Sequence, residues 1–138
     1  MATRPLVKLD FACRLELVTD AAYARGKEVK FGSDDLTITA AGTNDVLAIG
    51  TLERAVTAAG KAAAVILYGH AIVPVIVGTG GATRGKDAIT AADGFTDAPT
   101  NGTGTVSNAI KGKFMQSGVA GDEVGMLIGF NPRSVAGS

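Results

Sequence analysis

The chain has 138 residues, with 13 basic and 13 acidic side chains and a sequence pI near 6.6. This length predicts a single domain, and the balanced charge excludes the basic surface expected of a protein that binds nucleic acid or anionic membranes. Cys13 is the only cysteine, which excludes a disulfide framework and a cysteine metal cluster.

The N-terminal region is predicted to be an arm followed by a long strand. Its first residues have neither a long apolar core nor a small-residue cleavage site, so we expect no signal peptide and synthesis in the cytoplasm. From Leu6 to Val18 apolar and polar residues alternate, which predicts a half-buried strand. This strand is longer than the usual ~5–6 residues, so residues 1–18 are interpreted as an arm with the first strand.

The arm is also the first candidate interaction segment. A strand that extends beyond its own sheet leaves backbone groups unpaired, and unpaired edges favour strand addition by another chain. We expect the first residues to be disordered in the free protein and Leu6, Val7 and Leu9 to become buried against a neighbouring subunit. The alternative is that Leu6–Val18 is only the first strand of the domain.

Residues 19–130 are predicted to form one barrel-like domain of short strands, because the chain has 19 glycines and no tryptophan. Lys27–Phe31 and Leu36–Ala40 are predicted strands around a polar turn, whereas Asp45–Thr57 is compatible with either a short helix or a strand. Later strands are predicted at 87–90, 106–115 and 124–130, with a polar hairpin tip at 96–105 and a disordered tail at 131–138. The predicted fold class is all-β, with a minor helix possible.

Ala62–Val77 is the longest apolar run and is predicted to be the central strand. Both of its faces are apolar, so we expect a cover on both sides, supplied by a folded-over segment or by another chain. Pro74 has no N–H for a ladder, which places it at an edge, a bulge or a bend between two strands. Ile72, Val73 and Pro74 are therefore candidate residues for self-association.

A weak internal repeat links two parts of the sequence. Both parts have a glycine with a large apolar residue two positions later, then a glycine turn, then three apolar residues: Gly50-x-Leu52…Val65-Ile66-Leu67 and Gly112-x-Phe114…Met126-Leu127-Ile128. Both parts are interpreted as strand, turn and strand.

The segment Gly80–Asp87 fits the start of a phosphate-binding P-loop, G-x-x-x-x-G-K. The next position should be Ser or Thr, yet Asp87 stands there, and the residues that follow are too short and turn-rich for the helix that such a loop needs. A glycine-rich loop between strands is the preferred interpretation. His70 is the only histidine and is expected to be a satisfied core or interface residue. No catalytic group, cofactor site or metal site is predicted.

The order of the glycine-containing motifs resembles that of the small capsid decoration, or cement, proteins of tailed bacteriophages, of the small β-barrel type. The similarity runs from Gly26 to Phe130 and rests on Gly26-Lys27-x-Val29, Ala48-Ile49-Gly50, Gly85-x-x-Ala88-Ile89-Thr90, Ala92-Asp93-Gly94, Ile110-Lys111-Gly112 and Gly121-Asp122-Glu123-Val124-Gly125-Met126-Leu127. The chain departs from the pattern in its long N-terminal strand and in the insertion at 96–105.

The resemblance implies a non-enzymatic virion protein, made in the host cytoplasm, that binds the outer surface of an icosahedral capsid and stabilises the shell. It implies the major capsid protein as partner, self-association as a homotrimer, and no direct contact with nucleic acid or membrane. Two alternatives stay open: another phage structural component, such as a head-completion or tail protein, and a small β-barrel module that binds a ligand or nucleotide.

Overall fold

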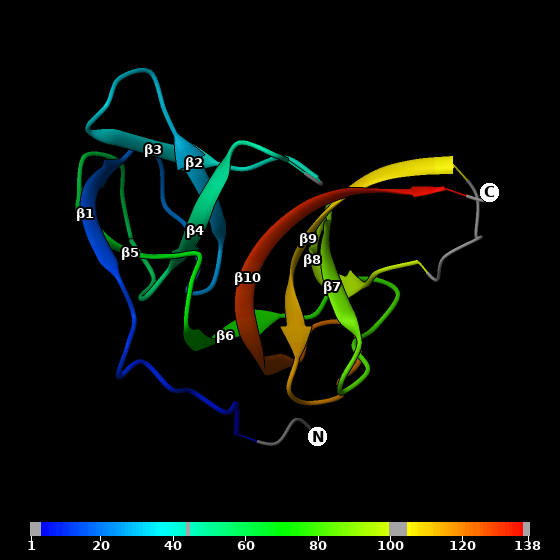
Figure 1. Cartoon of the computed structure of the whole chain (residues 1–138). Coiled ribbons are helices and arrows are strands. Elements are labelled where there is room, and N and C mark those ends of the chain that lie inside the picture. The colour runs from blue at the N-terminus through cyan, green and yellow to red at the C-terminus, as the bar shows by residue number, and fades with distance from the viewer. Residues whose placement is uncertain (1–3, 44, 100–104, 137–138) are drawn as a thin grey trace.

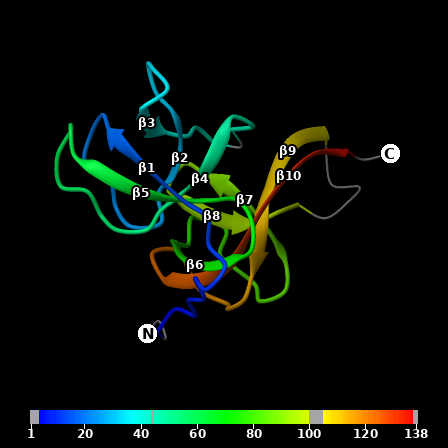
Figure 2. The ribbon, with the colours of Figure 1, turned by 60° about the vertical axis from the view of Figure 1, so that its left-hand side comes forward.

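The computed structural model describes residues 4–43, 45–99 and 105–136. Two groups of five strands lie side by side (Figures 1 and 2). The first group is a closed barrel in the order β1-β3-β2-β4-β5, and the second is a sheet in the order β6-β10-β9-β7-β8. The barrel strands are β1 (Arg14–Thr19), β2 (Glu28–Phe31), β3 (Thr37–Ala40), β4 (Ala48–Leu52) and β5 (Ala62–Leu67). The sheet strands are β6 (Ala71–Ile76), β7 (Asp87–Ala91), β8 (Gly94–Asp97), β9 (Thr105–Phe114) and β10 (Glu123–Ala136).

The second sheet repeats the first one strand for strand. If β6 to β10 are matched to β1 to β5 in chain order, both groups have the same sequence of neighbours. The register repeats too, because Gly50 pairs with Leu67 as Gly112 pairs with Ile128. Main-chain bonds outside the strands also correspond, as in Gly26 N to Leu52 O (2.9 Å) and Gly85 N to Phe114 O (2.7 Å). The weak repeat in the sequence is therefore a real structural repeat.

The two repeats differ in how completely they close. In the barrel, β1 and β3 form a parallel pair with Val18 opposite Thr37 and Thr19 opposite Ile38. At the matching place in the second sheet, the end of β6 meets β8 at a single parallel bridge, Val77 with Phe95. The second repeat is thus a sheet that curls toward closure, and β6 remains at its edge.

The fold class is confirmed, since the described residues contain strands and no helix. A helix long and apolar enough to cross a membrane is accordingly not found in the described ranges. Most predicted short strands are present, and the ambiguous segment Asp45–Thr57 contains strand β4. The tip at 96–105 lies partly outside the described residues.

Three predictions about elements need correction. The regular strand at the N-terminus covers only Arg14–Thr19, and before it the chain makes a turn and a single bridge. Ala62–Val77 is two strands that belong to different sheets, joined by a turn at Gly69 and His70. The tail predicted from residue 131 instead continues β10 as far as Ala136, opposite β9.

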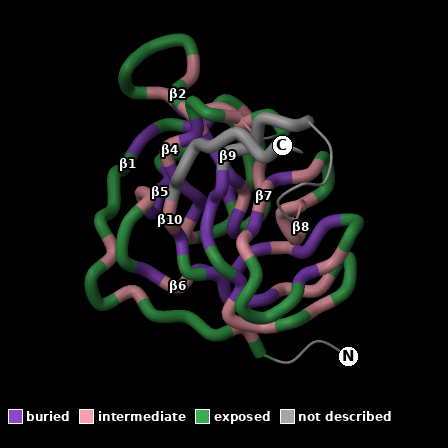
Figure 3. Tube along the Cα trace, turned by 45° about the vertical axis from the view of Figure 1, so that its right-hand side comes forward, coloured by how far each residue is buried: buried purple, intermediate pink, exposed green. Residues whose placement is uncertain are grey.

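Apolar residues from the strands form two adjoining cores, and the buried residues lie along the inner strand segments (Figure 3). The barrel core contains Leu17, Val29, Ile38, Leu52, Val56, Ala63 and Val65. The core of the second sheet includes Val73, Val75, Phe114 and Met126, together with Ile66 from β5 of the barrel. Because Val65 and Ile66 face different cores, the apolar run is covered on both sides within the chain itself. The loop after β2 is exposed (Figure 3).

Candidate interaction surfaces

The N-terminal arm, defined here as residues 4–12, lies on the second sheet of its own chain. The main-chain N–H and C=O of Lys8 bond to Ile72 of β6, both at 2.9 Å. Gln116 holds the preceding residues: its Oε1 accepts from Leu6 N at 2.8 Å, and its Nε2 donates to Arg4 O at 3.1 Å. The same Oε1 also accepts from Gly125 N at 2.8 Å, so one side chain joins the arm to β10.

Pro74 determines where the arm leaves β6. With Lys8 opposite Ile72 in an antiparallel bridge, the next hydrogen-bonded pair would be Leu6 with Pro74. Pro74 has no N–H to donate, so the ladder ends there and Gln116 binds Leu6 instead. Pro74 lies in the edge strand β6, which confirms one of the places predicted for it.

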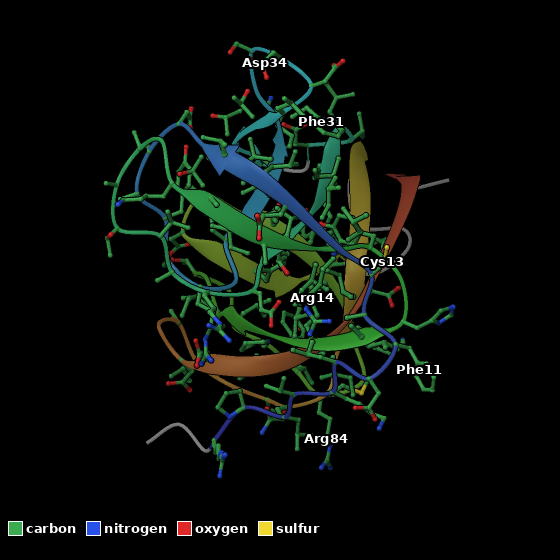
Figure 4. All side chains as sticks on the ribbon, turned by 90° about the vertical axis from the view of Figure 1, so that its left-hand side faces the viewer. Phe11, Cys13, Arg14, Phe31, Asp34 and Arg84 are labelled. Carbon is green, nitrogen blue, oxygen red and sulfur yellow. The ribbon has the colours of Figure 1, made fainter. Side chains whose placement is uncertain are left out.

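The six residues proposed from the sequence as interaction residues are close together but differ in exposure. Leu6 and Val7 on the arm are about half exposed, at 51% and 47%, and Leu9 is partly buried against the second core. On β6, Val73 and Pro74 are buried and Ile72 is intermediate. Of the six residues, the most exposed ones are therefore on the arm, where Phe11 is also 77% exposed and projects outward (Figure 4).

Several hollows of about 360 to 530 Å³ lie on or between the repeats. A groove of about 530 Å³ lies between the barrel and the turn of β7 and β8, lined by residues that include Arg25, Lys27 and Asp93. A second hollow of about 360 Å³ is lined almost entirely by apolar residues from the ends of the barrel strands: Leu15, Phe31, Ala48, Ile49, Leu67 and Tyr68. We name this second hollow the barrel mouth. Leu15 and Phe31 are 37% and 47% exposed there.

A buried polar cluster lies between the repeats, and the sequence did not reveal it. Lys111 of β9 and Glu28 of β2 form an ion pair with Nζ and Oε2 at 3.0 Å, and the Tyr68 hydroxyl donates to the same carboxylate oxygen. Burial raises the pKa of Glu28, although Tyr68 and Lys111 oppose this effect. Burial lowers the pKa of Lys111, and burial together with the Glu28 carboxylate raises the pKa of Tyr68. The one available signal was a lysine between Ile110 and Gly112 within a predicted strand.

Neither chemical motif from the sequence forms a catalytic arrangement. Gly80–Asp87 leads directly into strand β7, which confirms the glycine-rich loop between strands. A phosphate-binding P-loop would instead be followed by a helix. Asp87 pairs with Lys113 at 3.1 Å. His70 is exposed in the bend before β6, so it is not a core residue, and the alternative of an interface residue stays a prediction. Within the described residues, no group of three or more potential metal ligands occurs.

Comparisons with known proteins identify the fold. No protein-family model matches the chain, and no curated protein matches its sequence. Among solved structures, the crystal structure of the head fiber gp8.5 N base in bacteriophage phi29 is similar, with a TM-score of 0.58 and 19% sequence identity. The match covers 86% of this chain and 94% of that chain. At this level of identity the similarity shows a shared fold.

Proposed function

We propose that the chain is a structural protein of a tailed-phage virion that binds the outer surface of the capsid and stabilises the shell. The observation that carries the proposal is the fold shared, over most of both chains, with the phi29 head fiber base. The order of motifs that resembles phage decoration proteins supports the same class of function independently.

The mechanism follows from the surfaces that the fold exposes. The arm presents exposed Leu6, Val7 and Phe11 for contact with the capsid, and the barrel mouth presents Leu15 and Phe31 for contact with other copies of the chain. Each of these surfaces is small, so a single contact with the major capsid protein would be weak. Self-association, as a homotrimer in this proposal, would join several such contacts and raise the apparent affinity by avidity.

A specific observation favours a second candidate function. The structurally similar protein is the base of a head fiber, which favours an anchor for a head appendage as the second candidate. Both functions require capsid binding, but only a cement protein is expected to make the shell more resistant to heat or to loss of divalent cations.

Co-sedimentation with purified capsids tests the proposal. The protein should pellet with expanded capsids, saturate at a fixed ratio to the major capsid protein, and raise the temperature at which the filled heads release DNA. Saturable binding without such an effect would favour the anchor function. If the protein stays in the supernatant with expanded capsids at micromolar concentration, the proposed function is wrong.

A further inference from the structure

The structural repeat reveals an unoccupied strand edge on the barrel. Matching main-chain bonds place Thr19 and Val77 at equivalent positions: Thr19 N bonds to Lys61 O at 3.0 Å, and Val77 N bonds to Asp122 O at 2.8 Å. Counting back along both strands, Arg14 of β1 corresponds to Ile72 of β6, and Glu16 corresponds to Pro74. In the second sheet, the arm occupies this edge through the bridge from Lys8 to Ile72.

Along the same edge of β1, no strand of the described part of the chain pairs with Arg14 or Glu16, because β3 meets β1 only at Val18 and Thr19. Cys13 O and Thr19 N bond to the β5 side, whereas Val18 N bonds to Leu36 O on the β3 side. Because successive residues of a strand face opposite neighbours, the N–H and C=O groups of Arg14 and Glu16 point away from β5. The pairing of β1 with β3 begins only at Val18. Within the described residues, these main-chain groups therefore face an open edge.

The two repeats also differ in the residue at this edge. In β6, Pro74 stops ladder formation at the position that corresponds to Glu16, which is a common way to protect an edge strand. In β1, Glu16 keeps its N–H, so two hydrogen-bonding positions in succession remain available. The residues at this edge, Arg14 and Glu16, are exposed on the outer face of the barrel, and β1 lies at the front in Figure 4.

We propose that β1 pairs with β1 of a second copy of this chain, antiparallel and about a two-fold axis centred on Leu15. This register places Arg14 opposite Glu16 of the second copy and Glu16 opposite Arg14 of the second copy. Each pair exchanges its N–H···O=C bonds, so the open edges of both chains are satisfied. A two-fold contact must be self-complementary, and the segment Arg14-Leu15-Glu16 has opposite charges on either side of its centre.

The side chains support this register on both faces of the strand. On the outer face, opposite charges meet across the strands, which stabilises antiparallel pairs. Arg14 already contacts Glu53, with Nε and Oε1 at 2.6 Å, but a guanidinium has further donors for a second carboxylate. On the inner face, Leu15 meets its copy at the barrel mouth, where 37% of its surface is exposed beside Phe31. The contact thus covers apolar surface as well as backbone groups.

The pairing joins two copies, so in a trimeric assembly it would connect neighbouring trimers. It does not depend on capsid binding and is tested on the protein alone. In a Cys13→Ser background, Leu15→Cys should form a disulfide-linked dimer on mild oxidation, because directly opposed residues of a pair without hydrogen bonds lie within disulfide reach. The matched control is Asp35→Cys in the exposed loop after β2, which should form few disulfide-linked dimers.

Charge reversal tests the register. Sedimentation equilibrium up to about 1 mM should show the wild type joined through this contact, as dimers or as linked trimers. Glu16→Arg or Arg14→Glu alone should weaken this pairing by roughly tenfold or more, because like charges then face each other. A mixture of these two variants should restore dimers, as should the double variant. Asp35→Arg should dimerise like the wild type. Three results would each overturn the proposal: a monodisperse wild-type monomer, unchanged pairing of both single variants, or a mixture of the two variants that does not regain pairing. Thermal melting verifies that every variant is folded.

Discussion

Nζ of Lys111 in β9 lies 3.0 Å from Oε2 of Glu28 in β2, and both side chains are almost completely buried. This ion pair connects the second sheet with the barrel, and the Tyr68 hydroxyl completes the contact. Lys111 Nζ also donates to the main-chain oxygen of Asp45, in the turn before β4. The relative position of the two repeats therefore depends on a polar contact as well as on apolar packing.

Removing one partner of this ion pair should destabilise the protein much more than removing both partners. Lys111→Met leaves a buried carboxylate without its cation, and we expect a loss of about 3–5 kcal/mol in the free energy of unfolding. The double variant Lys111→Met/Glu28→Gln should recover a large part of that loss, since no unpaired charge remains. Urea denaturation measures the free energy of unfolding of the single and the double variant.

The matched control for this prediction is on the same strand. Lys113 pairs with Asp87, but both side chains are substantially exposed, at 48% and 39%. Lys113→Met should therefore cost less than about 1 kcal/mol. Equal effects of the two lysine substitutions would show that the buried ion pair has no special role.

Asp45 should make the stability pH-dependent in acid. Burial opposes ionisation, but bonds from the N–H groups of Gly42 and Leu47 and the charge of Lys30 lower the pKa of Asp45 from 3.8 to about 2. A lowered pKa contributes stability that is present above 3.8 and is lost as the pH falls through about 2. Asp45→Asn should therefore destabilise the protein by roughly 1–2 kcal/mol at pH 7, and the difference from the wild type should shrink between pH 4 and 2. A difference that stays constant over this range would contradict the assignment.

Two equivalent glycines should tolerate no side chain. A Cβ on Gly50 would lie 2.1 Å from Ile66 O, and a Cβ on Gly112 would lie 2.2 Å from Leu127 O. Gly50→Ala and Gly112→Ala should each destabilise the protein by about 1–3 kcal/mol through overpacking. Gly129 in β10 has open space around it, so Gly129→Ala should be neutral or slightly stabilising. Similar melting temperatures for all three variants would refute the close packing of Gly50 and Gly112 against the neighbouring main chain.

The glycine-rich loop should have no role in nucleotide binding. Lys86 is exposed and is followed by strand β7, so Lys86→Ala should change the melting temperature little. Isothermal titration calorimetry should detect no ATP binding to either protein. Saturable micromolar binding to the wild type that disappears in the variant would restore the P-loop interpretation.

The sequence predicted the individual strands better than their arrangement. Alternation and glycine turns located β2, β3, β7 and the repeat of β4–β5 in β9–β10, because these features are local. The break between β5 and β6 was not located, although a bend between two strands was one alternative for Pro74. Both faces of the run are apolar, and Val65 and Ile66 face different cores, so alternation does not show where one strand ends. Lys111 was missed because a lysine is rarely buried without a partner, and its partner Glu28 is distant in sequence. The Gln116 contact with the arm is equally long-range.

Electron cryomicroscopy of capsids incubated with the protein tests the central proposal most directly. If the account is correct, a difference map against bare capsids will show density on the outer surface at repeated lattice positions, and the two adjoining five-stranded repeats will fit into it. Capsids that remain bare at saturating protein concentration, or density confined to the tail or the portal vertex, would contradict a capsid-surface function.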